Sequence, residues 1–362
     1  MHNLLFNLLA FVAVLNQQSG TAALAKAIRE YAIVHHFSGS VVVEEDGKKV
    51  YEASYGLANR AFDVPCKPDT RFHIASITKA FTSAIVLKLV GEGKVDLHHT
   101  INTYLPSYKG EGAAKVTVEE LLNHTSGIQN LDSSIKSPDD ALRHGILHDQ
   151  LPFSSDEMLD KFCGGKLVHE PGKVFDYNNG EYIILGKIIE RVTGKVFDQV
   201  LRDFILGPLG MKNSGMLYQR DIVNKLASCY WSPDGKVPLI NNMPVYPENW
   251  YAAGGMYSTT GDLLSFADAL YSGKIIGFKS LNKMLEPGLD GYGYGLWVGY
   301  PKFGGKQFRN VNRPGGIMGA NGSFYHFNGV GFSKTINIVI LSNTNQADMD
   351  GFSWKIGETL LK

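Results

Sequence analysis

A serine and a lysine stand three residues apart where an apolar run with helical period begins. Residues 72–93 read FHIASITKAFTSAIVLKLVGEG and contain Ser76 and Lys79. A serine hydroxyl is a poor nucleophile until a base lies within hydrogen-bond reach. Positions i and i+3 share one face of a helix, so Lys79 would lie beside Oγ of Ser76, and the first turn offers free N–H groups for an oxyanion. Alone, however, the pair could also be an N-cap serine and a solvated lysine.

The Ser-x-x-Lys spacing itself is weak evidence, because it occurs three times in the sequence. The two other pairs are Ser133/Lys136 and Ser280/Lys283. Only Ser76 stands between an extended stretch, RFHIA, and a long apolar helix. That arrangement would bury Lys79, and burial lowers the pKa of a lysine toward that of a usable base.

A second polar pattern supports the chemical interpretation. Tyr177 and Asn179, in FDYNNGEYIILGKIIERVTG, form the one Tyr-x-Asn sequence among 17 tyrosines and precede a predicted helix. A tyrosinate near a lysine can act as a base and then protonate the leaving group, while an amide can bind a substrate carbonyl. The alternative is a capping turn with Asn179 near the N-cap.

The charge balance argues against a polyanionic partner. Thirty-five basic residues balance thirty-five acidic ones, and no run of like charge occurs. Neither a nucleic-acid footprint nor a polybasic membrane patch is indicated. We therefore expect a small-molecule partner.

The N-terminus resembles a secretory signal. An apolar run from Leu4 to Leu15 is followed by small residues ending at 23–25, and only His2, with no Lys or Arg, precedes it. The run is too short for a membrane span and suits the hydrophobic part of a signal peptide. We expect residues 1–25 to be a signal peptide and the protein to be secreted or periplasmic; the alternative is a plain N-terminal segment. No other stretch could span a bilayer.

The three cysteines give no sign of a metal site. They are Cys66, Cys163 and Cys229, far apart and without CxxC or Cys/His spacing. We expect buried structural cysteines. In an exported protein one disulfide is possible, and the sequence does not choose the pair.

The elements that must position these residues follow from the hydrophobic periodicity. Residues 22–35 have helical spacing, and two β-branched runs flank Asp46-Gly47, which predicts a hairpin. Residues 80–270 are mostly helical, including a helix that ends at Gly194. Strand patterns then return, and an amphipathic helix closes the chain. The order predicts an α+β fold, an antiparallel sheet built from both termini with an inserted helical region.

From about residue 26 to the end, the chain resembles the serine β-lactamase-related family, which includes class C β-lactamases, D-alanyl-D-alanine carboxypeptidases, D-aminopeptidases and carboxylesterases. The matching stretches, in order, are FSGSVVVEEDGKKVYEASYGLAN, FHIASITKAFTSAIVLKLVGEGKVDL, VTVEELLNHTSGI, PGKVFDYNNGEYIILGKIIERVTG, GPLGMKNSG, AAGGMYSTTGDLLSFADAL and YGYGLWVG. The resemblance implies a β-lactamase/transpeptidase-like fold. A sheet domain would comprise residues 26–78 and 285–362, a mainly helical domain residues 79–284, and the active site would lie between them.

The resemblance also implies roles. Ser76 corresponds to the nucleophile, Lys79 to its activating partner, Tyr177 to a second base and acid, and Asn179 to a substrate-binding residue. The family needs neither a metal nor an organic cofactor. Whether Lys79 or Tyr177 takes the serine proton stays open.

The family's third motif, Lys-Thr-Gly or His-x-Gly, is absent from the sequence. We expect Arg313-Pro314-Gly315 in its place, with Gly316 supplying a second oxyanion N–H; the rival is Lys302-Phe303-Gly304. Arginine can grip a carboxylate with two hydrogen bonds but cannot shuttle a proton. Proline at position 314 removes a donor. These departures favour an esterase or peptidase over an efficient β-lactamase.

The leading hypothesis is therefore a serine hydrolase that acts on a small ester, an amide or a D-amino-acid peptide through an acyl-enzyme. The alternative is a non-catalytic penicillin-binding-like or peptide-binding protein that retains the fold. A transacylase would differ only in the acceptor.

Other polar and aromatic residues receive structural interpretations. We expect His124 to be a hydrogen-bonding residue beside the cleft and Asp262 to lie at a helix start. Four aromatic residues are interpreted as strand packing: Tyr292, Tyr294, Trp297 and Tyr300.

Overall fold

The computed structural model describes residues 21–135, 137, 141, 143–232 and 238–362. The first 20 residues of the expected signal peptide and Lys136 of the second Ser-x-x-Lys pair lie outside these ranges. Within them, no helix has both the length and the apolar character needed to cross a membrane.

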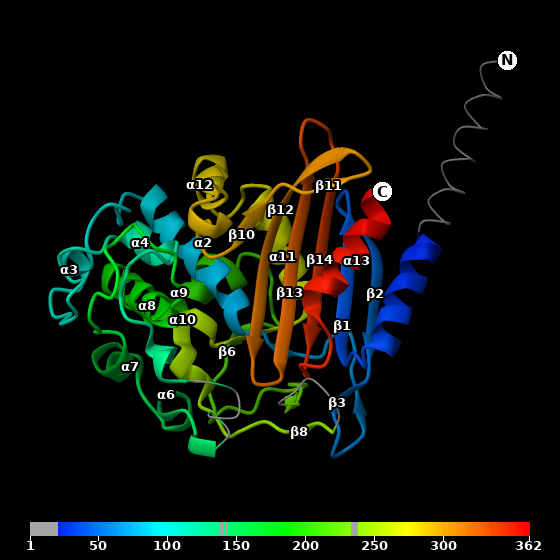
Figure 1. The fold of residues 1–362 in the computed structure, drawn as a ribbon, viewed down its shortest axis with the longest axis horizontal. Coiled ribbons are helices and arrows are strands. Elements are labelled where there is room, and N and C mark those ends of the chain that lie inside the picture. The colour runs from blue at the N-terminus through cyan, green and yellow to red at the C-terminus, as the bar shows by residue number, and fades with distance from the viewer. Residues whose placement is uncertain (1–20, 136, 138–140, 142, 233–237) are drawn as a thin grey trace.

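Among the described residues, seven strands form one antiparallel sheet (Figure 1). In spatial order the strands are β10 (Trp297–Gly299), β12 (Lys306–Ile317), β13 (Ala320–Gly329), β14 (Thr335–Ser342), β1 (Gly39–Glu45) and β2 (Lys48–Tyr55), with β11 (Lys302–Phe303) paired to β12. The two ends of the chain meet where β1 pairs with β14, with Val41 opposite Ile340. The predicted sheet built from both termini is confirmed.

The predicted hairpin at Asp46-Gly47 is also confirmed, because β1 and β2 flank it as an antiparallel pair. Both turn residues have left-handed backbone conformations, with φ of 49° at Asp46 and 74° at Gly47. Such a turn twists in the same sense as the strands it joins.

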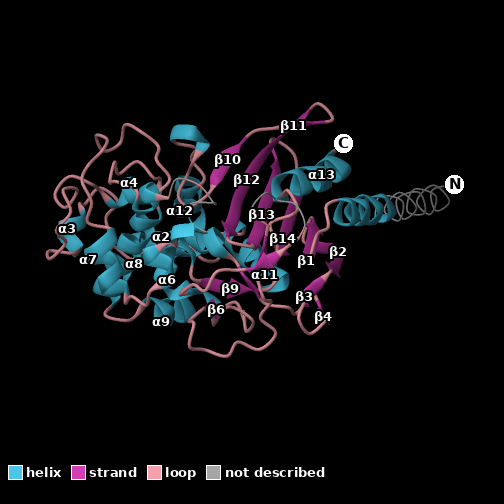
Figure 2. Ribbon diagram, turned by 60° about the horizontal axis from the view of Figure 1, so that its bottom comes forward, coloured by secondary structure: helices cyan, strands magenta, loops and turns pink. Residues whose placement is uncertain are grey.

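The sheet is covered on both faces, and the alternation along β1 assigns its side chains to them. Val41 and Val43 pack with the helix of residues 21–34 and with α13 (Met349–Leu361), whereas Val42 belongs to the opposite cluster. On that second face α11 (Thr260–Tyr271) packs against β14 and β1. Figure 2 shows the terminal helices on one side of the strands and α11 on the other. The predicted α+β architecture is confirmed.

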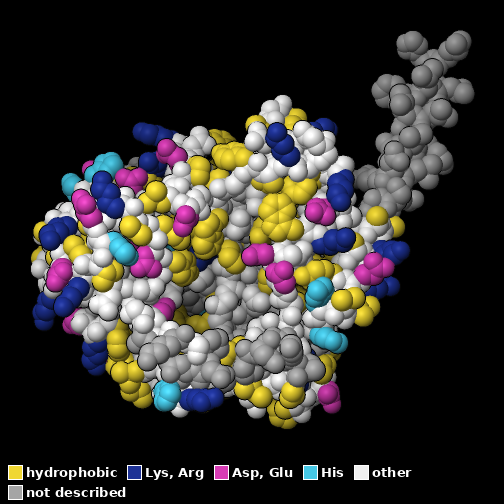
Figure 3. Space-filling view, viewed as in Figure 1, with side chains coloured by type: hydrophobic (Ala, Val, Ile, Leu, Met, Phe, Trp, Pro, Cys, Tyr) yellow, Lys and Arg dark blue, Asp and Glu magenta, His cyan; other side chains and the backbone are white. Residues whose placement is uncertain are grey.

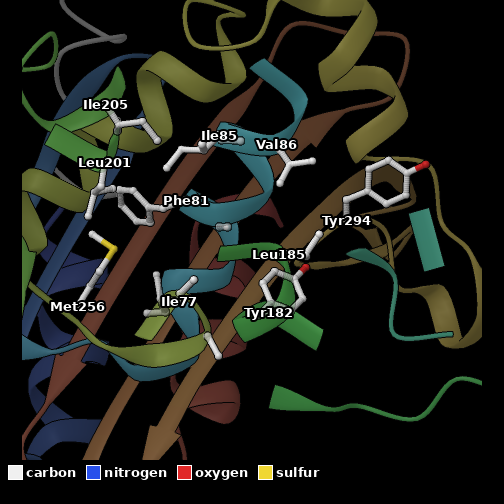
Figure 4. Packing of buried hydrophobic residues seen from close by; sticks show 14 of the residues in the cluster. Ile77, Phe81, Ile85, Val86, Tyr182, Leu185, Leu201, Ile205, Met256 and Tyr294 are labelled. Carbon is white, nitrogen blue, oxygen red and sulfur yellow. The ribbon is translucent and has the colours of Figure 1, made fainter. Parts of the chain in front are cut away.

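The helical region is organised around α2 (Thr78–Gly91) and α8 (Asn179–Thr193), which pack against each other. The other helices are α3 (Ile101–Tyr104), α4 (Val118–Leu122), α6 (Leu147–Gln150), α7 (Ser155–Phe162), α9 (Phe197–Leu201), α10 (Tyr251–Gly254) and α12 (Gly277–Met284). Figure 4 shows Phe81 and Ile85 of α2 in the core beside Leu201, with Tyr182 of α8 nearby. As predicted, α8 ends at Gly194, whose φ is 68°.

A second small sheet was not expected from the sequence. It joins β5 (Phe72–His73), β9 (Met256–Ser258) and β6 (Gly215–Met216), and it anchors the chain directly before Ser76. Strands of two or three residues are too short to show a periodicity of two. The predicted domain boundaries, residues 26–78 with 285–362 and residues 79–284, stay a prediction; α11 lies within the second range although it packs on the sheet.

Candidate active site

Ser76 lies in the tight 3₁₀ turn Ala75–Ile77, which directly precedes α2 and packs against β12 and β13. The turn is strained, because Ala75 has a φ of 46° although it carries a side chain. The N-cap of α2 is Ile77, and no side chain caps this helix. The interpretation of Ser76 as an N-cap is therefore wrong, and its hydroxyl is available to other partners.

Lys79 is fully buried, so the interpretation as a solvated lysine is wrong. Its Nζ donates to Oγ of Ser76 at 3.2 Å, to Oδ1 of Asn179 at 2.7 Å and to the carbonyl of Ala253 in α10 at 2.8 Å. Burial disfavours the ammonium form and lowers the pKa of Lys79 to about 8. A neutral amine beside the serine is thus accessible near physiological pH.

Tyr177 approaches the same serine from the other side. Its hydroxyl is 2.8 Å from Oγ of Ser76, and Nζ of Lys79 lies 4.8 Å from the centre of its ring. Burial alone would raise the pKa of Tyr177, but the charges of Arg313 and Lys79 outweigh it, and the net pKa lies below the ordinary tyrosine value. Two groups with lowered pKa values therefore converge on one hydroxyl.

The amide of Asn179 faces the lysine instead of capping α8. The N-cap is Asn178, whose side chain accepts from the N–H of Gly180. Oδ1 of Asn179 accepts from Lys79, and its Nδ2 donates to Oδ2 of Asp132 at 2.9 Å. Asp132 in turn contacts Nε2 of His148 at 2.9 Å. A hydrogen-bonded series thus leads away from the lysine, and neither Asp132 nor His148 was singled out in the sequence.

Arg313, on β12, lies directly behind Tyr177 and is 1% exposed. Its Nε donates to the carbonyl of Ser76 at 2.7 Å, its Nη1 to the hydroxyl of Tyr292 at 2.9 Å, and its Nη2 to the hydroxyl of Tyr177. The guanidinium carbon is 5.2 Å and 5.1 Å from the ring centres of Tyr177 and Trp297. The strand-packing interpretation missed that Tyr292 and Trp297 enclose this cation.

The two glycines after Arg313 have different surroundings. Gly315 is buried, and a Cβ on it would clash with the carbonyl oxygen of Ile74, so glycine lets β12 approach the serine turn closely. Gly316 is exposed, and a Cβ there would meet nothing closer than Oδ1 of Asn321 at 3.9 Å. The rival motif at residues 302–304 lies at the far end of β12, where β11 pairs with it.

The remaining residues that the sequence singled out have structural partners. Asp262 lies in the first turn of α11, as predicted, and accepts hydrogen bonds from the N–H of Asn213 and the hydroxyl of Ser214. Lys283 of the third Ser-x-x-Lys pair forms ion pairs on the surface. The three cysteines are unpaired, and Cys66 and Cys163 are buried.

The described residues contain no group of three or more His, Cys, Asp and Glu side chains arranged to hold a metal ion. Ser76, Tyr177 and Asn179 are partly exposed, whereas Lys79 and Arg313 are buried behind them. Hydrophobic side chains lie on both sides of the boundary between the helical region and the sheet in the space-filling view (Figure 3). A candidate nucleophile, two candidate bases and a buried cation are therefore assembled at this boundary.

Comparisons with known proteins give a consistent result. The family model described as Beta-lactamase matches residues 24–359. The chain is 27% identical over 283 residues to penicillin-binding protein PbpX of Bacillus subtilis (strain 168). The aligned residues make up 78% of this chain and 67% of that protein. Two further relatives are Protein flp of Staphylococcus aureus (strain MW2) and serine beta-lactamase-like protein LACTB, mitochondrial, of Homo sapiens. Both are longer than this chain, which spans 40% and 56% of their lengths.

Solved structures share the fold at low sequence identity. EstCE1, titled a hydrolase with promiscuous acyltransferase activity, superposes with a TM-score of 0.77 at 22% identity, over 94% of this chain and 99% of that one. The D-amino acid amidase of Ochrobactrum anthropi SV3 superposes with a TM-score of 0.73 at 24% identity. The superposition covers 93% of this chain and 98% of that one. At these identities the superpositions establish the fold alone.

Proposed function

The chain belongs to the Beta-lactamase family, and from this premise we propose that it is a serine hydrolase that forms an acyl-enzyme at Ser76. The observation that carries the proposal is the convergence of Lys79 and Tyr177 on Oγ of Ser76, at 3.2 Å and 2.8 Å. A base within hydrogen-bond reach activates a serine hydroxyl, and here two groups with lowered pKa values are within that reach.

In the proposed reaction, Oγ of Ser76 attacks the carbonyl carbon of the substrate and its proton passes to Tyr177 or Lys79. Backbone N–H groups of Ser76 and Gly316 hold the oxyanion. The protonated base then gives its proton to the leaving alcohol or amine, and the acyl group stays on Ser76. A water molecule, deprotonated by the same base, releases the acid and restores the serine. Asn179 orients Lys79 and contacts the substrate.

Arg313 has a different role in this proposal from the carboxylate grip that its chemistry suggested. The guanidinium is buried, and each of its three nitrogens donates to a protein oxygen. Its fixed charge stabilises the tyrosinate form of Tyr177, whose pKa it lowers. The proposed substrate is therefore a small ester or amide that is bound without a carboxylate clamp, and efficient cleavage of penicillins is not expected. Secretion, which rests on residues 1–25, stays a prediction.

Intact-mass spectrometry tests the proposal. The protein is incubated with a fluorophosphonate and, separately, with a penicillin, alongside Ser76→Ala as the control. We expect one fluorophosphonate adduct per chain, which is absent from the variant. No adduct on folded wild-type protein would favour the alternative, a non-catalytic binding protein. A penicillin adduct that accumulates would indicate penicillin binding, and one that turns over rapidly would indicate a β-lactamase.

A further inference from the structure

Behind Tyr177 lies a fully buried pair of titratable residues that the proposed mechanism does not use. His124 and Glu181 are 0% and 1% exposed, and Nδ1 of His124 is hydrogen-bonded to Oε2 of Glu181. His124 lies in the loop after α4 with a left-handed φ of 58°, and Glu181 lies in the first turn of α8. Holding a histidine in this conformation costs free energy, which the contacts of its ring and backbone must offset.

His124 contacts three consecutive residues of the turn that carries the tyrosine. Its carbonyl accepts from the N–H of Asp176 at 2.9 Å, and its ring centre is 4.4 Å from that of Tyr177. Its Nδ1 accepts from the N–H of Asn178 at 3.3 Å. The same residue therefore holds the backbone on both sides of Tyr177 and the face of its ring.

These contacts favour one arrangement of the protons. The N–H of Asn178 points at Nδ1, and a proton on Nδ1 would face this donor, so we assign Nδ1 as an acceptor whose one lone pair is shared between Asn178 and Glu181. With Nδ1 assigned as the acceptor, the proton of the hydrogen bond between Nδ1 and Oε2 of Glu181 belongs to the carboxyl group. The other oxygen of Glu181 accepts from the N–H of Ser126 at 3.4 Å.

The surroundings favour the uncharged form of both groups. Burial and the charges of Lys79 and Arg313 hold the pKa of His124 well below its usual range, and burial raises the pKa of Glu181 well above its own. Nε2 of His124 is buried without a hydrogen-bond partner among the described residues. Aromatic rings surround the imidazole instead: Phe175, Tyr177, Tyr182 and Tyr292. The charged and titratable groups that face the pair are Lys79 of α2, Arg313 of β12, Asp176 and Tyr177 of the turn, Tyr182 of α8, and the tyrosines Tyr108 and Tyr292.

We infer that His124 is a positioning residue of the Tyr177–Asn179 turn, and that it works as an uncharged acceptor whose partner Glu181 keeps the proton. This inference deepens the proposed function, on which its catalytic consequence rests. An ionised Glu181 would place a negative charge behind Tyr177 and oppose formation of the tyrosinate. A neutral acid provides the same hydrogen bond without that charge.

The charge state can be tested without any activity. Wild-type protein with ¹⁵N-labelled histidine is titrated between about pH 6 and 8, and His124→Phe identifies the resonances of His124. We expect a bare Nδ1 and a protonated Nε2 across this range, with no titration. Observation of an imidazolium, or of a proton on Nδ1, would overturn the inference. If Ser76 did not react with the fluorophosphonate, the proposed function would fail, and the titration would still decide the state of His124.

The positioning role is tested by the rate at which the fluorophosphonate labels Ser76. His124→Phe keeps a ring but loses the acceptor, and we expect it to slow labelling by about 10²-fold, the effect of a misplaced catalytic group. Glu181→Gln keeps a donor to Nδ1 and cannot ionise, so we expect labelling within about threefold of wild type and an unchanged pH dependence.

A matched control is His326→Phe. His326 is also buried, hydrogen-bonds Oδ1 of Asn337 at 2.7 Å and stacks on Tyr271, away from the serine. We expect this variant to lower the melting temperature without slowing labelling at 25 °C. If His124→Phe labelled as fast as His326→Phe, or if Glu181→Gln were as slow as His124→Phe, the inference would be wrong.

Discussion

The hydroxyl of Tyr177 lies 2.8 Å from Oγ of Ser76, although 101 residues separate them in the chain. Lys79, on α2, donates from Nζ to the same Oγ at 3.2 Å. Arg313 donates to the same tyrosine hydroxyl from the opposite side. Since a buried cation favours the anionic form of a neighbouring phenol, this relationship favours Tyr177 as a base and gives Arg313 a role that does not involve proton transfer.

The first prediction concerns the pH dependence of the wild-type protein. The pKa of Lys79 is lowered to about 8, and that of Tyr177 lies below its ordinary value. A base acts only when it is unprotonated, so the rate of fluorophosphonate labelling should rise about tenfold per pH unit on the acid side and level off above the controlling pKa. Intact-mass spectrometry of samples quenched at timed intervals, between about pH 5.5 and 9, measures the labelling rate. A flat profile would exclude Lys79, whose pKa lies within this range, as the base.

The second prediction concerns Arg313→Gln. The charge of Arg313 lowers the pKa values of both Tyr177 and Lys79. Its removal should move the rising part of the pH–rate profile, here called the rising limb, to higher pH. Labelling at neutral pH should slow by about 10²-fold, as for other lost electrostatic contacts. Arg309→Gln, on the same strand, is the control that should leave the limb in place. A limb that does not move would show that the guanidinium acts only on structure.

The third prediction is a shift of the pH–rate profile in the opposite direction, to lower pH. The carboxylate of Asp132 raises the pKa of Lys79, and Asp132 also accepts a hydrogen bond from Asn179. Asp132→Asn retains an acceptor but loses the charge, so the pKa of Lys79 should fall further. If Lys79 is the base, the rising limb moves to lower pH. No movement in this variant, together with a shift in Arg313→Gln, would assign the limb to Tyr177.

The fourth prediction uses two adjacent glycines as a matched pair. A Cβ at Gly315 would clash with the carbonyl oxygen of Ile74, whereas one at Gly316 would make only an ordinary contact with Oδ1 of Asn321 at 3.9 Å. Gly315→Ala should lower the free energy of unfolding by about 1–3 kcal/mol, as overpacking does. Gly316→Ala should change it by less than about 0.5 kcal/mol. Urea denaturation compares them, and equal losses would contradict the close approach of β12 to the serine turn.

The hairpin at Asp46-Gly47 and the end of α8 at Gly194 could be predicted because local backbone chemistry determines them: both glycines adopt a left-handed φ. The small sheet before Ser76 could not, since its strands are two or three residues long and are held by partners far along the chain. The N-cap interpretation of Ser76 failed for a related reason, whereas Asn179 does lie next to the N-cap, Asn178. The side chains of Ser76 and Asn179 both bind partners from other elements, and local propensity does not predict these contacts.

The sequence by itself determined the fold class, the spacing of Ser76 and Lys79 on one turn, and the order of the motifs. These depend on periodicity and on contacts three residues apart. Only the tertiary structure decided that Lys79 is fully buried, that Arg313 lies behind Tyr177 within an aromatic enclosure, and that His124 and Glu181 pair beneath that tyrosine. The physical reason is that pKa values and hydrogen-bond partners depend on burial and on charges brought together from α2, α8 and β12. No local pattern encodes that environment.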